Sequence, residues 1–519
     1  MKKCTDIKAY EDHYIVHKRQ QCDQILNCPN LTSAFQKEAF KRKWKTVSSK
    51  EKVKLLLKKV ISCFGIKKPL FTGDYMLEED IRQCFQDMAI YCNILGATSK
   101  LMFDRGVTEK KKMVRPLWTR DWVKNLGNIV SEQRKYIALM VKTLDSGGLE
   151  QVVKLLAMQF RLNGIEVKVF CTHCGGRTAK ELQDSGIEVI EFHNNKALFN
   201  NYLKEKTPLL INTHFASDFY EIIAKYQIPI VEVIHNMYVF LTDKQLETEK
   251  KKAEYISHYI AVSETAKEVF RHKIPQVSED KITVIGNSVI KQESPVCRRS
   301  EVRKKYGVSE GDFVFLMAGS IDARKNQIGV LRALDMVRHL TDQKIFLFLA
   351  GAETDPEYKE KLNRFMVDCT LQDNVIFLGY TNRISEIMGA SDVLIMDSYY
   401  EGWSMAATEA LLCGIPLIHS ECGSGKELVA GGENGILISN PIKNIFSINS
   451  VDLYDMMHMG KNENIAELVA AMLSILKNRI SWKKSQNEII NYAESHFSVS
   501  NMLQQYAKIF DESCANTCG

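Results

Sequence analysis

The chain has 519 residues, 45% of them hydrophobic and 25% charged, with a formal net charge of +6 at pH 7. This composition is that of an ordinary globular protein, and the small net charge gives no sign of dedicated nucleic-acid binding. The longest apolar runs, such as 345–351, are much shorter than the roughly 20 residues that a membrane-spanning helix requires.

Residues 1–130 are expected to form a mainly helical extension of unknown function. Within it, 37–68 is strongly basic, and Ser48 with Glu51 forms a capping box for an amphipathic helix over 48–64. Two interpretations of this helix remain open. It lies on an anionic membrane surface, or it packs on its own domain with its lysines in water.

The N-terminus and the cysteines point to the cytoplasm. Residues 1–30 are polar and lack the apolar segment of a secretory signal. The 14 cysteines are dispersed, and the pairs Cys171/Cys174 and Cys514/Cys518 have no second pair at zinc-ribbon spacing. We therefore expect free thiols, no metal site and no other cofactor.

From residue 135 onward, short apolar runs alternate with amphipathic helices, which is typical of parallel sheets covered on both faces. The first predicted strands are YIALMVKTL, VKVFCT, VIEF, LLINTH, IPIVEVIH and YIAVS, with ITVIG at the border. The second set is FVFLMAG, KIFLFLAG, VIFLGY, DVLIMDS and PLIHS, after a charged hinge at 287–307. The pattern predicts an α/β protein with two doubly wound, Rossmann-like domains, 131–290 and 291–490, facing a cleft.

Ligands of doubly wound sheets bind at the carboxyl ends of the strands, so the loops there are candidate sites. After the first strand, Asp145, Ser146, Gly147 and Gly148 lead into a helix whose amides would face a ligand. The alternative is a tight strand–helix connection. The chain has no GxGxxG sequence, which argues against a dinucleotide-dependent oxidoreductase.

The segment EGWSMAATEALLCGIPLIHSEC (401–422) places Glu401 on a loop and Glu409 inside a helix that begins after Ser404 and ends at Gly414. The helix N-terminus favours an anion such as a diphosphate, and each carboxylate can accept hydrogen bonds from sugar or ribose hydroxyls. The amides expected to point at that anion are those of Gly402, Trp403, Ser404 and Met405. The alternative is an ordinary buried strand and helix, with Glu401 in solvent.

Other strand ends carry further candidates. Arg324 and Lys325 follow the strand at 313–319, where they would neutralise a departing diphosphate, with the ligand as the partner of Lys325. The alternative, two solvated cations at a helix start, opposes the helix dipole. His235 ends the strand IPIVEVI, where it is either a satisfied polar group or a sugar contact. A second small-residue turn contains Gly423 and Ser424.

In their order, these segments resemble the motifs of glycosyltransferase family 4, the retaining enzymes of GT-B fold, over roughly residues 135–512. EGWSMAATEALLCGIP resembles the family's EGxxxxxxE motif with its small-residue turn and Pro-containing strand. The other matching segments are DSGGLEQVVKLLAMQFRLNGIEVKVF, VEVIHNMY, YIAVSETAKEVF, KITVIGNSVI and FVFLMAGSIDARKNQIGVLRAL. The resemblance also implies that the terminal helix, 491–519, returns to the first domain.

The resemblance implies a hexosyltransferase that moves a sugar from a nucleotide-sugar donor to a glycan or lipid-linked acceptor in cell-surface polysaccharide or glycoconjugate synthesis, with retention of anomeric configuration. It acts in the cytoplasm or at the inner face of the membrane. Since no carboxylate pair is evident beside the diphosphate site, we expect metal independence. The implied catalytic residues are Glu401, Lys325 and His235. The implied donor-binding residues are Gly147, Gly148, Arg324, Gly402, Trp403, Ser404, Met405, Glu409, Gly423 and Ser424.

One position departs from the family pattern. The arginine that often follows the glycine after the strand at 313–319 is Ser320 here. Either Arg324 replaces it from a few residues along, or Lys325 works with less help. Three other functions remain as alternatives: a GT-B sugar-nucleotide epimerase, a glycan phosphorylase, and an inactive GT-B binding module. A phosphorylase should carry a cofactor lysine or a phosphate pocket that is not evident, and an inactive module should have lost Glu401, Glu409 or Lys325.

Overall fold

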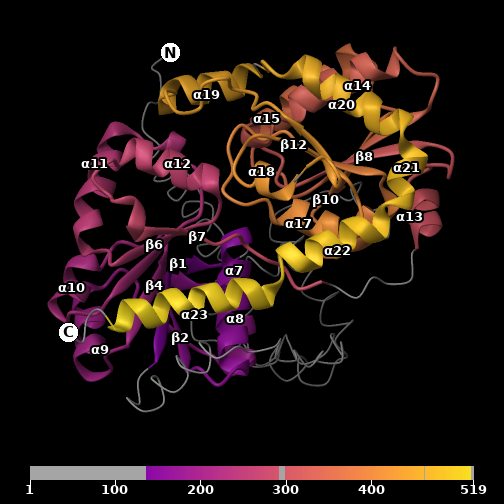
Figure 1. Cartoon of the computed structure of the whole chain (residues 1–519). Helices are drawn as coiled ribbons and strands as arrows, with labels where there is room; N and C mark the ends of the chain where they lie inside the picture. Colours follow the sequence, from indigo (N-terminus) through magenta and orange to yellow (C-terminus); the bar gives the residue numbers. More distant parts are fainter. Residues whose placement is uncertain (1–135, 146, 292–297, 430, 461, 516–519) are drawn as a thin grey trace, which may run out of the picture. The chain divides into compact units, whose positions relative to one another are not determined.

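The computed structural model describes residues 136–145, 147–291, 298–429, 431–460 and 462–515 (Figure 1). The predicted extension, 1–130, with its basic helix at 48–64, lies outside the described residues. None of the helices in the described part combines the length and the apolar character needed to cross a bilayer.

The first sheet is parallel throughout and has seven strands in the order β3-β2-β1-β4-β5-β6-β7. Its strands are β1 (Ile137–Leu144), β2 (Val167–Gly175), β3 (Glu188–Glu191), β4 (Leu210–His214), β5 (Ile230–Ile234), β6 (His258–Ala261) and β7 (Ile282–Val284). The central strands β4 and β5 are buried along their whole length, which explains why they appear in the sequence as continuous apolar runs. The helices of this part are α7 (Gly148–Leu162), α8 (Arg177–Asp184), α9 (Lys196–Glu205), α10 (Tyr220–Lys225), α11 (Asp243–Lys252) and α12 (Glu264–Lys273).

The second sheet is also parallel and has six strands in the order β10-β9-β8-β11-β12-β13. Its strands are β8 (Phe313–Ala318), β9 (Ile345–Ala350), β10 (Val375–Gly379), β11 (Val393–Met396), β12 (Leu417–Ser420) and β13 (Gly435–Ile438). The helices are α13 (Arg299–Lys305), α14 (Gln327–Arg338), α15 (Pro356–Asp368), α16 (Ile384–Ala390), α17 (Met405–Leu412), α18 (Gly425–Leu428) and α19 (Ser450–Met459). The prediction of two doubly wound sheets is confirmed.

The first six strands of each sheet follow the same order, in which the fourth strand pairs with the free side of the first strand. The direction of winding therefore reverses between β1 and β4 in the first sheet, and between β8 and β11 in the second. At such a switch point the loops that leave the two strands diverge and open a crevice, where doubly wound proteins bind ligands.

In the described part, four helices follow α19: α20 (Ile465–Lys477), α21 (Arg479–Lys484), α22 (Gln486–His496) and α23 (Val499–Ala515). The last helix, yellow in Figure 1, packs against α7 of the first sheet. Its buried stripe includes Met502, Tyr506 and Phe510, and the ring of Phe510 stacks on that of Phe160 at 5.7 Å. The chain thus returns from the second sheet to the first at its end.

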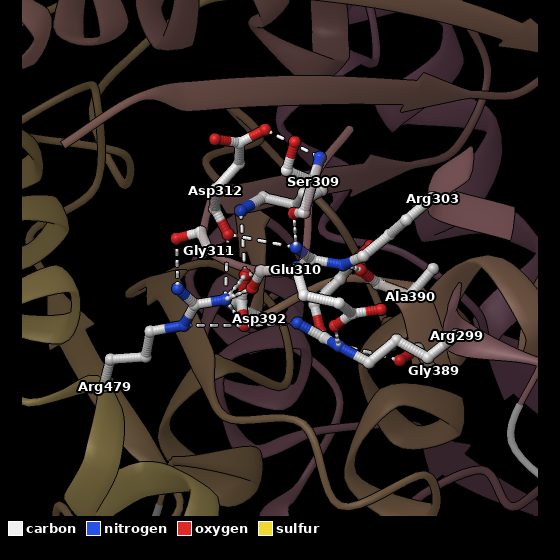
Figure 2. A network of polar contacts seen from close by, with 12 residues as sticks. Arg299, Arg303, Ser309, Glu310, Gly311, Asp312, Gly389, Ala390, Asp392 and Arg479 are labelled. Carbon is white, nitrogen blue, oxygen red and sulfur yellow. Dashed lines mark hydrogen bonds and ion pairs between the residues drawn. The ribbon is translucent and has the colours of Figure 1, made fainter. Parts of the chain in front are cut away.

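A polar network binds α13 and α21 to the amino edge of the second sheet (Figure 2). Asp392 lies just before β11, with its side chain 3% exposed. Its carboxylate accepts hydrogen bonds from Arg299 at 2.8 Å, Arg303 at 2.7 Å and Arg479 at 3.2 Å. The arginines also donate to backbone carbonyls, among them that of Ala390 at the end of α16, where cations are favoured by the helix dipole. One buried carboxylate therefore anchors segments far apart in the sequence.

Candidate functional site

The candidate site begins at the switch point of the second sheet. Lys325 ends a short 3-10 turn (Ala323–Lys325) after β8, and Glu401 follows β11. Because β8 and β11 are neighbours, their loops meet, and the Lys325 ammonium forms an ion pair with Glu401 Oε1. Arg324 Nη1 lies 3.4 Å from the same oxygen. The fold thus joins Glu401 to two adjacent cations that lie 76 and 77 positions before it in the sequence.

These charges determine the ionisation of Glu401. Glu401 is only 7% exposed, and burial by itself would raise the pKa of its carboxyl. The positive charges of Lys325 and Arg324 outweigh burial and hold the pKa of Glu401 below its usual value. Glu401 is therefore an ionised hydrogen-bond acceptor at neutral pH. The expectation that only a ligand pairs with Lys325 is wrong, because the buried carboxylate of Glu401 already does.

Ser320 stands at the position where the family often has an arginine. Its hydroxyl donates a hydrogen bond to the carboxylate of Asp322. Asp322 in turn lies 3.7 Å from Arg324 Nη2, and the Arg324 guanidinium lies over the ring of Tyr400 at 5.9 Å. Burial by itself would lower the pKa of Arg324, but the carboxylates of Glu401 and Asp322 outweigh burial and raise this pKa above its usual value. Arg324 is thus directed to the site by neighbours on both sides.

Glu409 lies in α17, with a side chain that is half-buried. Ser404 caps the start of the helix, where its Oγ accepts from the amide of Ala407 at 3.3 Å. Gly414, whose φ of +74° favours glycine, lies two residues after the end of the helix at Leu412. Burial raises the pKa of Glu409 to about 7. Glu409 therefore differs from Glu401, because no positive charge offsets the cost of burying its carboxylate.

The loop before α17 is more engaged than the sequence suggests. The amide of Ser404 donates to Ser424 Oγ at 2.9 Å, so the prediction that this amide points at a bound anion is wrong. Ser424 reaches this amide because it follows a tight turn at Gly423, where φ is +51°. This turn packs so closely that a Cβ added to Gly423 would lie 2.8 Å from the Glu401 carbonyl oxygen. The predicted second turn thus lies directly against the 401–404 loop. The side chain of Trp403 belongs to the hydrophobic core, and its indole donates to Thr408 Oγ1 at 2.9 Å.

Residues of the first sheet lie beside this loop. Gly147 caps α7, and a Cβ added to Gly148 would lie 3.7 Å from Cγ of Met405 at the start of α17. A Cβ on Gly402 would collide with the backbone carbonyl of His235, which follows β5. The backbones at Gly402 and His235 approach so closely that only glycine fits. The structure therefore brings together candidates from both sheets.

Two polar residues escaped the sequence analysis. His419 is the residue before the last in β12 and is 1% exposed. Its Nδ1 donates to the Ser420 carbonyl at 2.7 Å, while its Nε2 has no hydrogen-bond partner among the described residues. Burial lowers the pKa of His419 to about 4, so the ring is neutral at pH 7. Its place at the carboxyl end of a central strand was the available signal.

Asp397 follows β11 and is fully buried. Its carboxylate accepts hydrogen bonds from the amides of Asn326 at 2.8 Å, Asn462 at 3.2 Å and Asn464 at 2.7 Å, and burial raises its pKa to about 7. Asn326 follows Lys325 directly, has a φ of +57° and caps α14. Asp397 therefore holds the turn that presents Lys325. The sequence signal was Asn326 itself, a residue that tolerates this conformation.

Neither metal nor disulfide chemistry is evident in the described ranges. No three His, Cys, Asp or Glu side chains there gather as the ligands of a metal ion would. Cys171 is buried and Cys174 is exposed, and both are free thiols.

Two doubly wound parallel sheets of this kind are the architecture of the GT-B transferases. Two family models match the chain. The model of "Glycosyltransferase Family 4" matches residues 146–292, and that of "Glycosyl transferases group 1" matches residues 298–447. The chain belongs to glycosyltransferase family 4.

Curated relatives resemble parts of the chain. A UDP-Gal:alpha-D-GlcNAc-diphosphoundecaprenol alpha-1,3-galactosyltransferase of Escherichia coli is 29% identical over 162 residues, which are 30% of this chain and 41% of the relative. The lipopolysaccharide glucosyltransferase WaaG of E. coli K12 is 24% identical over 204 residues, which are 39% of this chain and 48% of the relative. The chain spans less than half the length of these relatives.

Solved structures share the fold. HepE of Anabaena in complex with UDP superposes with a TM-score of 0.60 at 20% identity, over 73% of this chain and 100% of HepE. The structure of WaaG gives a TM-score of 0.51 at 17% identity, over 72% of this chain and 99% of WaaG. These similarities support the GT-B fold.

Proposed function

We propose that this protein is a retaining hexosyltransferase that moves a sugar from a UDP-sugar to a hydroxyl group of a glycan or lipid-linked acceptor. The observation that carries the proposal is the group of Lys325, Arg324 and Glu401 at the switch point of the second sheet. The choice of UDP is supported by the E. coli relative whose name includes UDP-Gal. A glycan or lipid-linked acceptor is supported by the same relative and by the lipopolysaccharide glucosyltransferase.

The charges suit the departure of a nucleoside diphosphate. As the bond between the anomeric carbon and the diphosphate oxygen breaks, negative charge accumulates on the diphosphate, and fixed cations at that place lower the barrier. Lys325 and Arg324 are held in position by Glu401. The remaining lone pairs of the ionised Glu401 accept hydrogen bonds from the sugar hydroxyls, while Glu409 accepts from the ribose.

The transfer step balances without a further reactant. The acceptor oxygen forms a bond to the anomeric carbon on the face that the diphosphate leaves, so the anomeric configuration is retained. The acceptor proton passes to the departing diphosphate oxygen. Retention is supported by the resemblance to family 4.

The test uses the purified full-length chain with UDP-galactose, UDP-glucose and UDP-N-acetylglucosamine, each with a short-chain lipid diphosphate bearing N-acetylglucosamine. Proton NMR of the product gives the anomeric configuration. We expect an α-linked product from an α-configured donor. A β-linked product would disprove retention. If none of these donors is consumed and none raises the melting temperature, the proposed UDP-sugar transferase activity is wrong.

A further inference from the structure

A chain of hydrogen bonds runs through the carboxyl edge of the first sheet and ends at His235. The Nδ2 amide of Asn212 donates to the carbonyl of Val231 at 2.9 Å. Asn212 Oδ1 lies 2.9 Å from His214 Nε2, and His214 Nδ1 lies 2.7 Å from His235 Nε2. Asn212 and His214 are buried, whereas His235 is half-buried.

The register of the sheet explains how these side chains meet. Asn212 pairs with Val231 and His214 with Val233 in the parallel ladder of β4 and β5. Because side chains alternate between the faces of a sheet, positions two apart share a face, so Asn212 and His214 lie in line with His235. Phe215 then leaves β4 with a φ of +55°, and its ring lies 5.8 Å from that of His235.

The direction of the chain follows from its buried end. The Val231 carbonyl can only accept, so the amide group of Asn212 faces it and Oδ1 faces His214. Since Oδ1 also only accepts, the proton of His214 is on Nε2. Burial and the neighbouring imidazole lower the pKa of His214, and burial lowers that of His235 to about 3, so each ring carries one proton at pH 7. His214 Nδ1 is therefore an acceptor, and the proton of His235 is on Nε2.

We propose that Asn212 and His214 are positioning residues that hold His235 in the tautomer protonated on Nε2, so that Nδ1 accepts a hydrogen bond from a substrate hydroxyl. The hydroxyl belongs to the donor sugar or to the incoming acceptor. A neutral acceptor nitrogen selects an O–H group and repels the oxygens of a diphosphate. His235 is thus assigned to the sugar and not to the nucleotide. The assignment of a substrate hydroxyl to His235 Nδ1 rests on the proposed function, but the assignment of the tautomer does not.

The tautomer is measured on the protein without substrate, so the result does not depend on the proposed activity. Two-bond nitrogen–proton correlation spectra of protein labelled with nitrogen-15 histidine distinguish a protonated ring nitrogen from an unprotonated one. The His235 signals are assigned by their loss in His235→Gln. We expect His235 to be protonated on Nε2 alone. A proton on Nδ1, or an even mixture of tautomers, in the wild-type protein would overturn the proposal.

Two variants at His214 separate positioning from packing. His214→Gln keeps an acceptor oxygen toward His235 and should preserve its tautomer and most of the activity. His214→Leu fills the space without an acceptor and should give mixed tautomers and a loss of about 3-fold to 10-fold in kcat/KM. His258→Gln is the control. Its imidazole bonds Thr283 Oγ1 at 2.9 Å elsewhere in the sheet, and it should change neither quantity. Equal losses of kcat/KM in the Gln and Leu variants, with the His235 tautomer unchanged in both, would show that His214 contributes only packing.

The rates of donor hydrolysis and of sugar transfer, compared in the same variant, show whether the hydroxyl that His235 contacts belongs to the donor sugar or to the acceptor. If it belongs to the donor sugar, His214→Leu should weaken both UDP-sugar hydrolysis without acceptor and transfer. If it belongs to the acceptor, hydrolysis should stay at the wild-type rate while KM for the acceptor rises. If the His235 tautomer is mixed in this variant but the kinetics of both reactions are unchanged, the contact between His235 Nδ1 and a substrate hydroxyl is refuted. The tautomer assignment would still hold.

Discussion

Glu401 and Glu409 lie in one short segment but differ in their electrostatic surroundings, so their loss should have different effects. Glu401→Gln removes the charge that holds Lys325 and accepts from the sugar, so turnover should fall most. Glu409→Gln should mainly weaken donor binding. Each lost charged hydrogen bond should cost about 1.5 to 3 kcal/mol. Steady-state kinetics with titrated donor separate kcat from KM, and near-wild-type values for both variants would contradict the assignment.

The raised pKa of Glu409 predicts a dependence of donor binding on pH. The carboxylate form accepts from the ribose, and burial places its pKa at about 7. As the pH falls below 7, the carboxyl becomes protonated, and kcat/KM for the donor should fall about tenfold per pH unit. Glu409→Gln does not titrate and should lack this dependence. A profile that is the same in the variant and the wild type would show that another group is responsible.

Lys325→Ala should damage both turnover and stability. Loss of one preorganised charge at the leaving group should lower kcat by about 100-fold to 1000-fold. Because the buried Glu401 then keeps only Arg324, the free energy of unfolding should fall by about 1 to 3 kcal/mol. The double variant with Glu401→Gln should recover the melting temperature but not the activity. Full turnover of Lys325→Ala at saturating donor would place the catalytic cation elsewhere.

Arg324→Ala tests whether this arginine replaces the one absent at Ser320. If it does, the loss of turnover should approach that of Lys325→Ala, because the guanidinium shares the same carboxylate. Ser320→Ala is the matched control. It removes only the hydroxyl bonded to Asp322 and should have a small effect. Wild-type turnover in Arg324→Ala would mean that Lys325 neutralises the diphosphate without this arginine.

At the scale of elements, Asp392 holds α13 and α21 on the second sheet (Figure 2). Asp392→Ala leaves three arginines without their shared buried carboxylate, which should cost about 3 to 5 kcal/mol of the free energy of unfolding. Glu310→Ala, at the exposed edge of the network, should cost less than about 1 kcal/mol. Urea unfolding of both variants measures the difference. Equal stabilities would show that the network does not anchor these helices.

The sequence predicts the elements better than their contacts. Buried strands such as β4 and β5 were predictable because both faces are covered and their residues are continuously apolar. The ends of α17 were predictable because Ser404 and Gly414 carry local signals. The hydrogen bond from Ser404 to Ser424 and the pair His214–His235 were not, since they depend on which strands are neighbours. Periodicity carries no information on that order.

At the scale of the whole molecule, the repeated strand order explains why the candidate residues of the second sheet converge. Lys325 and Glu401 were predicted separately, at the ends of two strands. Only the adjacency of β8 and β11 makes them a pair. Their positions at strand ends and the resemblance to family 4 suggested their roles, and the structure adds the ion pair between them. For the extension at 1–130, the membrane and packing interpretations stay predictions.

We predict that activity does not require a divalent metal ion. Lys325 and Arg324 already supply positive charge where the diphosphate leaves, so a metal ion has no assigned task. Turnover in EDTA should equal turnover in magnesium. Activity that is lost in EDTA and restored by magnesium or manganese would contradict this prediction.

The most direct test of the account is the release of UDP from a panel of UDP-hexoses by the purified full-length chain, compared with Glu401→Gln and with Lys325→Ala. The account predicts that the wild-type protein releases UDP from at least one donor, that Lys325→Ala loses about 100-fold or more of that rate, and that Glu401→Gln loses about 10-fold to 100-fold. Release that persists in both variants, or none at all from a wild-type protein that also fails to bind UDP, would contradict the claim that this carboxyl edge holds the nucleotide sugar.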